Sequence, residues 1–417
     1  MQTLLLLPMW GIVDCGQVST IISTMPETST PKAFFGRNAS VLLDIIRFSA
    51  ALVVANIHIT RFSPAWHPLP ESAGNMAVCV FFVLSGFVIR FITTARVTTA
   101  RDYWIDRASR IYSVTIPALI LTVIFEGIAV SVHPAAFYHF ADPYRWIDVP
   151  RQLLASMTFT TGLWGYGMPP LSNAPFWSLT FEVIYYILYG VIHYTKTARW
   201  LLVPLILLIS GPSIALLFPV WLFGVLLYDV YRWLHGQRAA VPIAGIILAA
   251  SAIILAALRH PILHLIAVTS VRQRQLVQEQ IVNALPFKDQ ILNLGPVAWL
   301  DRLSPSFYLV GGLLSVVLLF TMTVLDRHIP ALPKTAASRI RFVADSTFTL
   351  YLLHRPFFVL VYSLMGRSPN GKVIPVLLLV IITVISVALA VPLDRLKNTM
   401  RTGLRRGFIP STVESVT

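Results

Sequence analysis

An acid, an arginine and a histidine share one strongly apolar stretch of this sequence, LDIIRFSAALVVANIH, which occupies positions 43–58. They are Asp44, Arg47 and His58. If the stretch is helical, the eleven-residue step from Arg47 to His58 places both side chains on one face, about 16 Å apart along the axis. Asp44 lies one turn before Arg47, so it can pair with the guanidinium and lessen the cost of burying it.

The chemistry that such a stretch can support depends on His58. Imidazole titrates near neutral pH and can accept a proton from a hydroxyl within hydrogen-bond reach. Ionisable groups in an apolar span are costly and usually face a cavity or a partner. Two interpretations therefore fit this segment alone: a structural ion pair with an interfacial histidine, or a polar stripe along a cavity with His58 as general base.

A second carboxylate, Glu182, lies in the apolar segment FWSLTFEVIYY at positions 176–186. A carboxylate in an apolar helix needs a partner or a chemical role. Glu182 can orient the His58 imidazole, act as a second base, or pair with an arginine. Three neighbours are predicted to line the same wall: Trp177, Ser178 and Tyr185.

A second histidine, His354, follows Tyr351 in the segment LYLLHRPF. Together with Tyr351 it is predicted to line the cavity. The alternative for His354 is an interfacial position near a kink at Pro356.

The elements that position these residues follow from composition. The 417-residue chain is 56% hydrophobic and only 12% charged, and its mean hydropathy is +0.73. Several apolar runs reach about 20 residues, enough to cross a bilayer core of about 30 Å. Strict alternation of apolar and polar residues is not seen. The sequence therefore predicts an all-α, polytopic transmembrane helix bundle.

Ten spans are predicted along the chain. They lie near 39–59, 74–95, 112–131, 176–194, 199–211, 213–234, 240–258, 305–325, 345–365 and 373–394. The pair Gly211-Pro212 is interpreted as a tight turn between the fifth and sixth spans. Two long segments, 132–175 and 259–304, contain aromatics, Gly and Pro, which favours structured caps or re-entrant segments over plain linkers.

The net charge of +14 is explained by basic residues on cytoplasmic loops, so no nucleic-acid partner is predicted. With the N-terminus inside, cytoplasmic segments hold nearly twice as many Lys and Arg as outer ones. Both termini are therefore predicted to be cytoplasmic, in the inner (cytoplasmic) membrane. We expect an N-terminal extension over 1–38, a transmembrane domain over 39–395 and a basic cytoplasmic tail over 396–417. No metal site is predicted, and the two cysteines suggest no disulfide framework.

Taken together, these motifs resemble the acyltransferase-3 family of membrane acyltransferases. The mark of that family is an Arg followed by ten residues and a His, here Arg47 and His58. Later blocks resemble the family in order: VFFVLSGFVI at 80–89, RASRIY at 107–112, FWSLTFEVIYY at 176–186, WLFGVLLYDV at 221–230 and LYLLHRPF at 350–357. The resemblance covers roughly 39–395. Two features depart from the family pattern: the proline after Arg-x-x-Arg comes late, at Pro117, and the last span ends in PLDRLK.

The resemblance implies transfer of an acyl group, usually acetyl from acetyl-CoA, to a hydroxyl of a sugar. The expected partners are acyl-CoA, a cell-surface polysaccharide such as an exopolysaccharide, or a lipid-linked sugar, and membrane lipids. No tightly bound cofactor is expected. In this interpretation His58 is the base, Glu182 supports it or acts as a second base, and Asp44 and Arg47 hold the polar network of the cavity.

The resemblance also favours a donor-binding role for Arg107 and Arg110. They lie one turn apart at the predicted cytoplasmic start of the third span, and arginine binds phosphate in a bidentate way. A plain positive-inside anchor is the alternative. Ser85, before Gly86, either allows close approach of a pantetheine arm or serves helix packing.

Two other functions remain open from the sequence. A secondary transporter can use Asp44, Arg47, His58 and Glu182 as an intramembrane proton relay, although the sequence shows no internal repeat of the kind many transporters have. An enzyme of the same class can acylate a small secondary metabolite instead of a sugar polymer, and no residue separates these two acceptors.

Overall fold

The computed structural model describes residues 36–70, 72–95, 99–141, 144–165, 169–254, 256–257, 305–368 and 371–407. Within those ranges every regular element is helical. Eight helical stretches are long and apolar enough to cross a membrane. They are built from α2 (Arg37–Thr60), α3 (Ser72–Ala95), α4 (Ala100–Val132), α7 (Trp177–Tyr194), α9 (Pro212–His235), α12 (Pro305–His328), α13 (Lys334–Ala344) continued by α14 (Thr347–Met365), and α15 (Val373–Gly407).

Two shorter apolar helices, α8 (Arg199–Ser210) and Ala240–Ile254, complete the set. These helices fall on the ten predicted spans, so the prediction of an all-α transmembrane bundle is confirmed. Residues 1–35 and 408–417 and the segment 259–304 lie outside the described residues, as do the predictions made for them.

The turn predicted at Gly211-Pro212 is confirmed. Helix α8 ends at Ser210, α9 begins at Pro212, and Gly211 between them has a φ of +86°. A Cβ on Gly211 would lie 2.7 Å from the Trp164 backbone. Both the positive φ and the close approach therefore favour glycine at this position.

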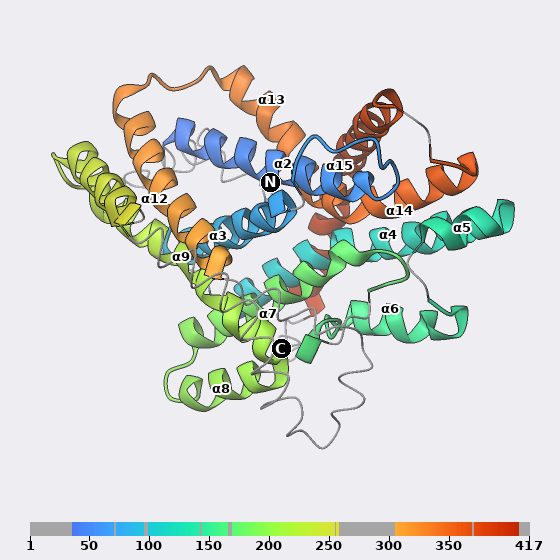
Figure 1. Ribbon diagram of the computed structural model, residues 1–417. Helices are drawn as coiled ribbons and strands as arrows, with labels where there is room; N and C mark the ends of the chain where they lie inside the picture. The colour runs from blue at the N-terminus through green and yellow to red at the C-terminus, as the bar shows by residue number, and fades with distance from the viewer. Residues whose placement is uncertain are drawn as a thin grey trace, which may run out of the picture.

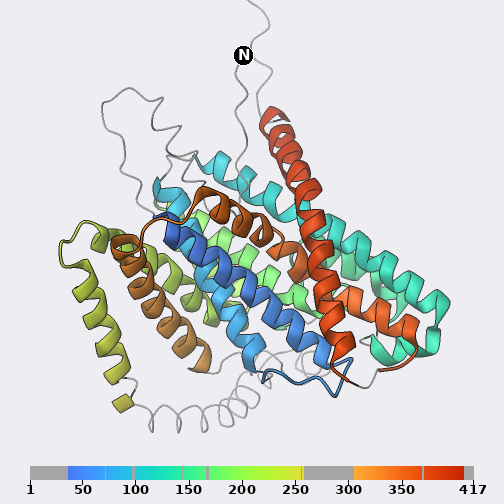
Figure 2. The same cartoon turned by 90° about the horizontal axis from the view of Figure 1, so that it is seen from above.

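Two helix boundaries differ from the prediction. Helix α4 begins at Ala100 rather than near 112, because the Thr99 hydroxyl caps it by accepting a hydrogen bond of 3.1 Å from the Asp102 amide. Arg107 and Arg110 therefore lie well inside a helix. Helix α15 continues to Gly407, so the basic residues after position 394 extend the last helix. Figure 2 shows this end of α15 reaching beyond the neighbouring helices.

The described parts of the segment 132–175 are structured, as predicted. The segment contains α5 (Pro134–Phe140), η1 (Trp146–Asp148), α6 (Val149–Met157), η2 (Leu163–Gly165) and η3 (Ala174–Phe176). Three of its non-glycine residues have positive φ angles near +53°: Phe159, Trp164 and Leu171. Such conformations are costly and persist only where surrounding contacts impose them.

Helix α2, which carries the Arg-x10-His motif, is central to the packing. It contacts α3, α12, α13 and α14, and α14 in turn contacts α4 and α15 (Figure 1). The apolar core runs through these contacts and includes buried side chains from α2, α3, α4, α7, α9 and α14. This arrangement brings motifs that are far apart in sequence, on α2, α3, α7 and α14, around one interior space.

Candidate active site

Two histidines from distant segments contact each other directly. His58 lies in the last turn of α2, and His354 lies in the middle of α14. The His354 Nε2 atom is 2.9 Å from His58 Nδ1, and the ring centroids are 4.9 Å apart. His354 is fully buried, whereas His58 is only partly buried.

Backbone carbonyls fix the proton positions in this pair. His354 Nδ1 lies 3.0 Å from the Leu350 carbonyl, which can only accept, so a neutral His354 carries its proton on Nδ1. Its Nε2 must then accept, and His58 Nδ1 must donate. The Val54 carbonyl, 3.0 Å from His58 Nδ1, favours the same assignment. His58 is left with an unprotonated Nε2, which is the form a general base requires.

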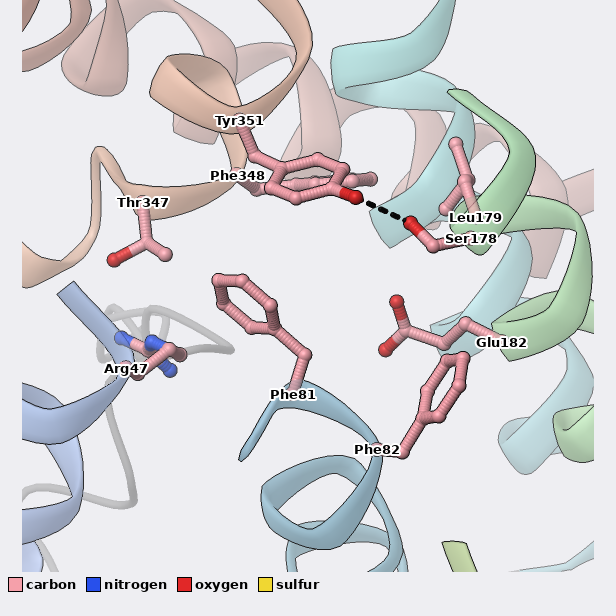
Figure 3. A pocket seen from close by; sticks show the side chains of 9 residues that line it. All are labelled: Arg47, Phe81, Phe82, Ser178, Leu179, Glu182, Thr347, Phe348 and Tyr351. Atoms are coloured by element: carbon pink, nitrogen blue, oxygen red, sulfur yellow. Dashed lines mark hydrogen bonds between the residues drawn. The ribbon is translucent and has the colours of Figure 1, made fainter. Parts of the chain in front are cut away.

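A cavity of about 30 Å³ lies beyond Tyr351, and neither His58 nor His354 is among its lining residues. It is lined by Arg47, Phe81, Phe82, Ser178, Leu179, Glu182, Thr347, Phe348 and Tyr351. Figure 3 shows Arg47 and Glu182 on opposite sides, with the Phe81 ring between them. The Tyr351 hydroxyl lies 2.6 Å from Ser178 Oγ, and its ring centroid is 6.2 Å from that of His354. Tyr351 therefore joins the cavity wall to the histidine pair.

The pairing predicted for Asp44 and Arg47 is confirmed. Arg47 Nη2 is 3.1 Å from Asp44 Oδ1, and both side chains are buried. Arg47 also donates a 3.1 Å hydrogen bond to the Ala344 carbonyl, while Arg341 Nε lies 3.9 Å from the other Asp44 oxygen. These contacts fix the guanidinium in the wall of the cavity and offset part of its desolvation cost.

Glu182 is held by hydroxyl groups. It accepts a 3.0 Å hydrogen bond from Ser85 Oγ and a short one from the Tyr186 hydroxyl. Ser85 Oγ in turn accepts from Trp221 Nε1 at 3.1 Å. The structure thus shows Glu182 as a carboxylate that accepts hydrogen bonds from residues of α3 and α7. The side chain that contacts the His58 ring is that of His354 and not that of Glu182.

The Ser85-Gly86 pair lies where α3 and α9 are in close contact. A Cβ on Gly86 would lie 2.1 Å from the Trp221 carbonyl oxygen, and one on Gly224 would lie 1.9 Å from the Val83 carbonyl oxygen. No side chain fits at either position. Helix packing therefore explains the glycine at position 86. Ser85 instead donates a hydrogen bond to Glu182.

The remaining predicted site residues surround the cavity at different depths. Ser178 and Tyr351 line it. The buried Tyr185 hydroxyl donates to the Ile214 carbonyl at 3.0 Å, and the Trp177 ring centroid lies 5.1 Å from that of Phe181. These two residues belong to the packing behind the cavity wall.

Arg107 and Arg110 are both buried inside α4. The Arg107 guanidinium carbon lies 5.7 Å from the centroid of the Tyr186 ring, and that of Arg110 lies 5.7 Å from the Phe348 ring. Cation–π contacts of this kind stabilise buried guanidinium groups. Arg107 thus packs on a residue that hydrogen-bonds Glu182, and Arg110 packs on a residue that lines the cavity.

Sequence reasoning missed Glu126, a buried carboxylate in α4. Glu126 accepts hydrogen bonds from Ser172 Oγ at 2.5 Å, the Ser172 amide at 3.2 Å and the Tyr144 hydroxyl at 2.7 Å. Burial and the neighbouring carboxylate raise the pKa of Tyr144, so its phenol keeps the proton it donates. Arg355, beside His354, donates to the Ser172 carbonyl at 2.5 Å. The signal was available, because Glu126 is an acid within the predicted span 112–131.

This network anchors the loop before α7 to α4 and α14. Changing Glu126 to glutamine is expected to lower the free energy of unfolding by about 1–3 kcal/mol, because an amide cannot accept all three hydrogen bonds in this geometry. Thermal unfolding of the detergent-solubilised chain measures the effect. Asp148→Asn is the matched control, since Asp148 forms its ion pair with the exposed Arg145. Equal melting temperatures for Glu126→Gln and wild type would contradict the anchoring role.

Comparison with known proteins identifies the family of this chain. The sequence model of the acyltransferase-3 family, described as an acyltransferase domain, matches residues 41–395. The chain therefore belongs to the acyltransferase-3 family, and its apolar helices make it an integral membrane protein. The match spans the Arg47–His58 motif, Glu182 and His354.

One curated relative is an O-acetyl transferase of Shigella phage Sf6. It is 26% identical over 203 residues, which cover 43% of this chain and 57% of the relative. The matched part is thus little more than half of that relative's length. Comparison with solved structures gave no match.

Proposed function

We propose that this protein is a membrane O-acetyltransferase that moves an acetyl group from acetyl-CoA to a hydroxyl of a cell-surface polysaccharide or a lipid-linked sugar. The observation that carries the proposal is the His58–His354 pair, which the Tyr351 ring connects to a cavity lined by Arg47 and Glu182. Family membership and the relative named an O-acetyl transferase support the same reaction class.

The proposed reaction needs one base. His58 Nε2 takes the proton of the acceptor hydroxyl as its oxygen attacks the thioester carbonyl carbon. Arg47 lies about 16 Å from His58 along the axis of α2, so it orders the polar network of the cavity with Asp44 and does not contact the reacting carbonyl. The carbon–sulfur bond then breaks, and the CoA thiolate takes the proton back from His58. The products are an ester and CoA thiol.

The site also supports passage of the acetyl group across the membrane. On the predicted orientation Arg47 lies in the cytoplasmic half of α2 and His58 lies near its outer end. Single cysteines at positions 47 and 58, placed in a chain without Cys15 and Cys79, test this with membrane-impermeant thiol reagents. We expect the two positions to be labelled from opposite sides of the membrane. Labelling of both from the same side would contradict passage of the acetyl group across the membrane.

The reaction itself is tested with membranes that contain the chain and membranes that lack it. Radiolabelled acetyl-CoA is supplied with surface glycans extracted from the host, and label in the glycan is counted. We expect label that depends on the chain and is released by mild alkali, as an O-acetyl ester requires. If no label enters the glycan or a panel of small hydroxyl acceptors, the proposed function is wrong.

A further inference from the structure

A buried arginine, Arg355, follows His354 in α14 and takes no part in the proposed proton transfer. Arg355 is only 1% exposed. A guanidinium inside an apolar bundle is costly to desolvate, and such residues usually have a partner or a role. The contacts of Arg355 join α14 to the loop before α7, to α4 and to the end of α2, so they indicate what that role is.

The first contact is with the loop before α7. Arg355 Nε donates a hydrogen bond of 2.5 Å to the Ser172 carbonyl, while the amide and the hydroxyl of Ser172 donate to Glu126 of α4. One residue therefore bridges a buried cation and a buried anion through three hydrogen bonds. This bridge offsets part of the cost of burying the two opposite charges.

The second contact is with the end of α2. The Arg355 guanidinium carbon lies 5.9 Å from the centroid of the Phe62 ring, within the range of cation–π attraction. Phe62 is buried and lies one turn beyond His58, with its amide hydrogen-bonded to the Ile59 carbonyl at 3.0 Å. The Phe62 ring centroid is also 6.2 Å from that of Phe358 on α14.

Two pairs of rings therefore connect the end of α2 to α14, one turn apart. His58 contacts His354, and four residues further along both segments Phe62 contacts Phe358. Residues four apart lie on one face of a helical segment, so a shift at the second pair also moves the first. Aromatic packing alone leaves the second pair free to slide, whereas Arg355 ties the Phe62 ring to an anchored loop.

We propose that Arg355 is a positioning residue for the acetyl transfer: it clamps the end of α2 and the loop before α7 onto α14, and so keeps His58 in contact with His354. Arginine suits this task because its planar guanidinium can stack its face on a ring while its edge donates a hydrogen bond, which the ammonium of lysine cannot do. The expected effect on rate rests on the proposed function, but the clamp itself does not.

Cross-linking tests the clamp without any measurement of activity. Cysteines replace His58 and His354 in a full-length chain without its two native cysteines, and a short bifunctional methanethiosulfonate joins them in membranes. Mass spectrometry follows the linked peptides. Arg355→Lys keeps the charge opposite Glu126, yet it is expected to slow this cross-link about fivefold, because the stacked contact with the ring is lost.

The control is a cysteine pair at Thr93 and Tyr189, whose hydroxyls lie 2.8 Å apart between α3 and α7. Its cross-linking rate should not depend on position 355. The neutral double variant Glu126→Gln/Arg355→Gln leaves no unpaired charge, so it keeps the test valid if Arg355→Lys fails to fold. Unchanged cross-linking of positions 58 and 354 in these variants would overturn the clamp, and so would equal slowing of both cysteine pairs.

Kinetics then test the effect of the clamp on the reaction. Arg355→Lys is expected to lower kcat about tenfold with KM for acetyl-CoA unchanged, because a small displacement of the base costs rate without removing a contact to the donor. In the His58→Ala chain the same change should cause no further loss. Arg367→Gln, an exposed cation just after α14, is the control and should keep the wild-type rate.

The two experiments separate this inference from the proposed function. If no chain transfers acetyl, the proposed function is wrong, and cross-linking still decides whether Arg355 fixes α2 on α14. If wild type is active and Arg355→Lys lowers the rate equally with and without His58, the residue acts through general packing, and the positioning role is overturned.

Discussion

Replacing His58 with alanine is expected to lower kcat/KM for acetyl transfer by about 10²–10⁴-fold, the usual contribution of a positioned general base. The acceptor hydroxyl is a weak nucleophile while it holds its proton, and His58 Nε2 is the unprotonated ring nitrogen that the hydrogen bonds of the pair leave available. Initial rates of transfer from labelled acetyl-CoA to surface glycan measure the effect in membranes with matched amounts of each variant.

The control for this variant is His193→Ala, which removes an exposed imidazole from α7. It should transfer acetyl at the wild-type rate. His58→Ala also leaves Nε2 of the buried His354 without its donor, so the melting temperature of the variant is measured beside its activity. If His58→Ala keeps full activity, the base is another group, and Glu182→Gln becomes the variant to measure, because Glu182 is the carboxylate in the cavity wall.

Apolar runs and turn residues were enough to predict the spans. A run of about 20 apolar residues has few alternatives to a membrane helix. The turn at Gly211-Pro212 was equally readable, since glycine and proline restrict the backbone in ways that local sequence reveals. The start of α4 could not be predicted in this way, because hydropathy gives no sign of the Thr99 cap, and the helix that it begins runs through a polar segment.

Pairings within one helix were predictable, whereas those between helices were not. Asp44 and Arg47 lie one turn apart, and their ion pair follows from helical geometry alone. His58 and His354 are separated by 296 positions, and only the packing of α2 on α14 brings them together. The sequence therefore indicated which residues were chemically interesting, but it left the partner of each one open.

The same distinction applies to Glu182. Its position in an apolar segment marked it as a residue with a partner or a role. The partners themselves, Ser85 and Tyr186, lie on α3 and one turn further along α7. The contact with Tyr186 could be predicted from helical spacing. The contact with Ser85 could not, because it depends on the close approach of α3 and α9 at Gly86 and Gly224.

Replacing His354 with alanine is expected to lower kcat by about 10²-fold with little change in KM for acetyl-CoA, because the imidazole of His58 would lose the contact that fixes its orientation and its proton on Nδ1. His354 acts through His58 and does not itself take the acceptor proton, since its unprotonated Nε2 already accepts the hydrogen bond from His58 Nδ1. It is therefore a positioning residue. Steady-state rates at varied acetyl-CoA separate the two constants.

Two further variants distinguish positioning from a general structural role. In His354→Gln, the side-chain carbonyl can accept from His58 Nδ1–H, so part of the lost kcat should return. In the double variant His58→Ala/His354→Ala, activity should equal that of His58→Ala alone, because a residue that acts only through another has no effect once that partner is gone. An additional loss in the double variant would mean that His354, which is fully buried in α14, contributes to the site through packing and not through the orientation of His58.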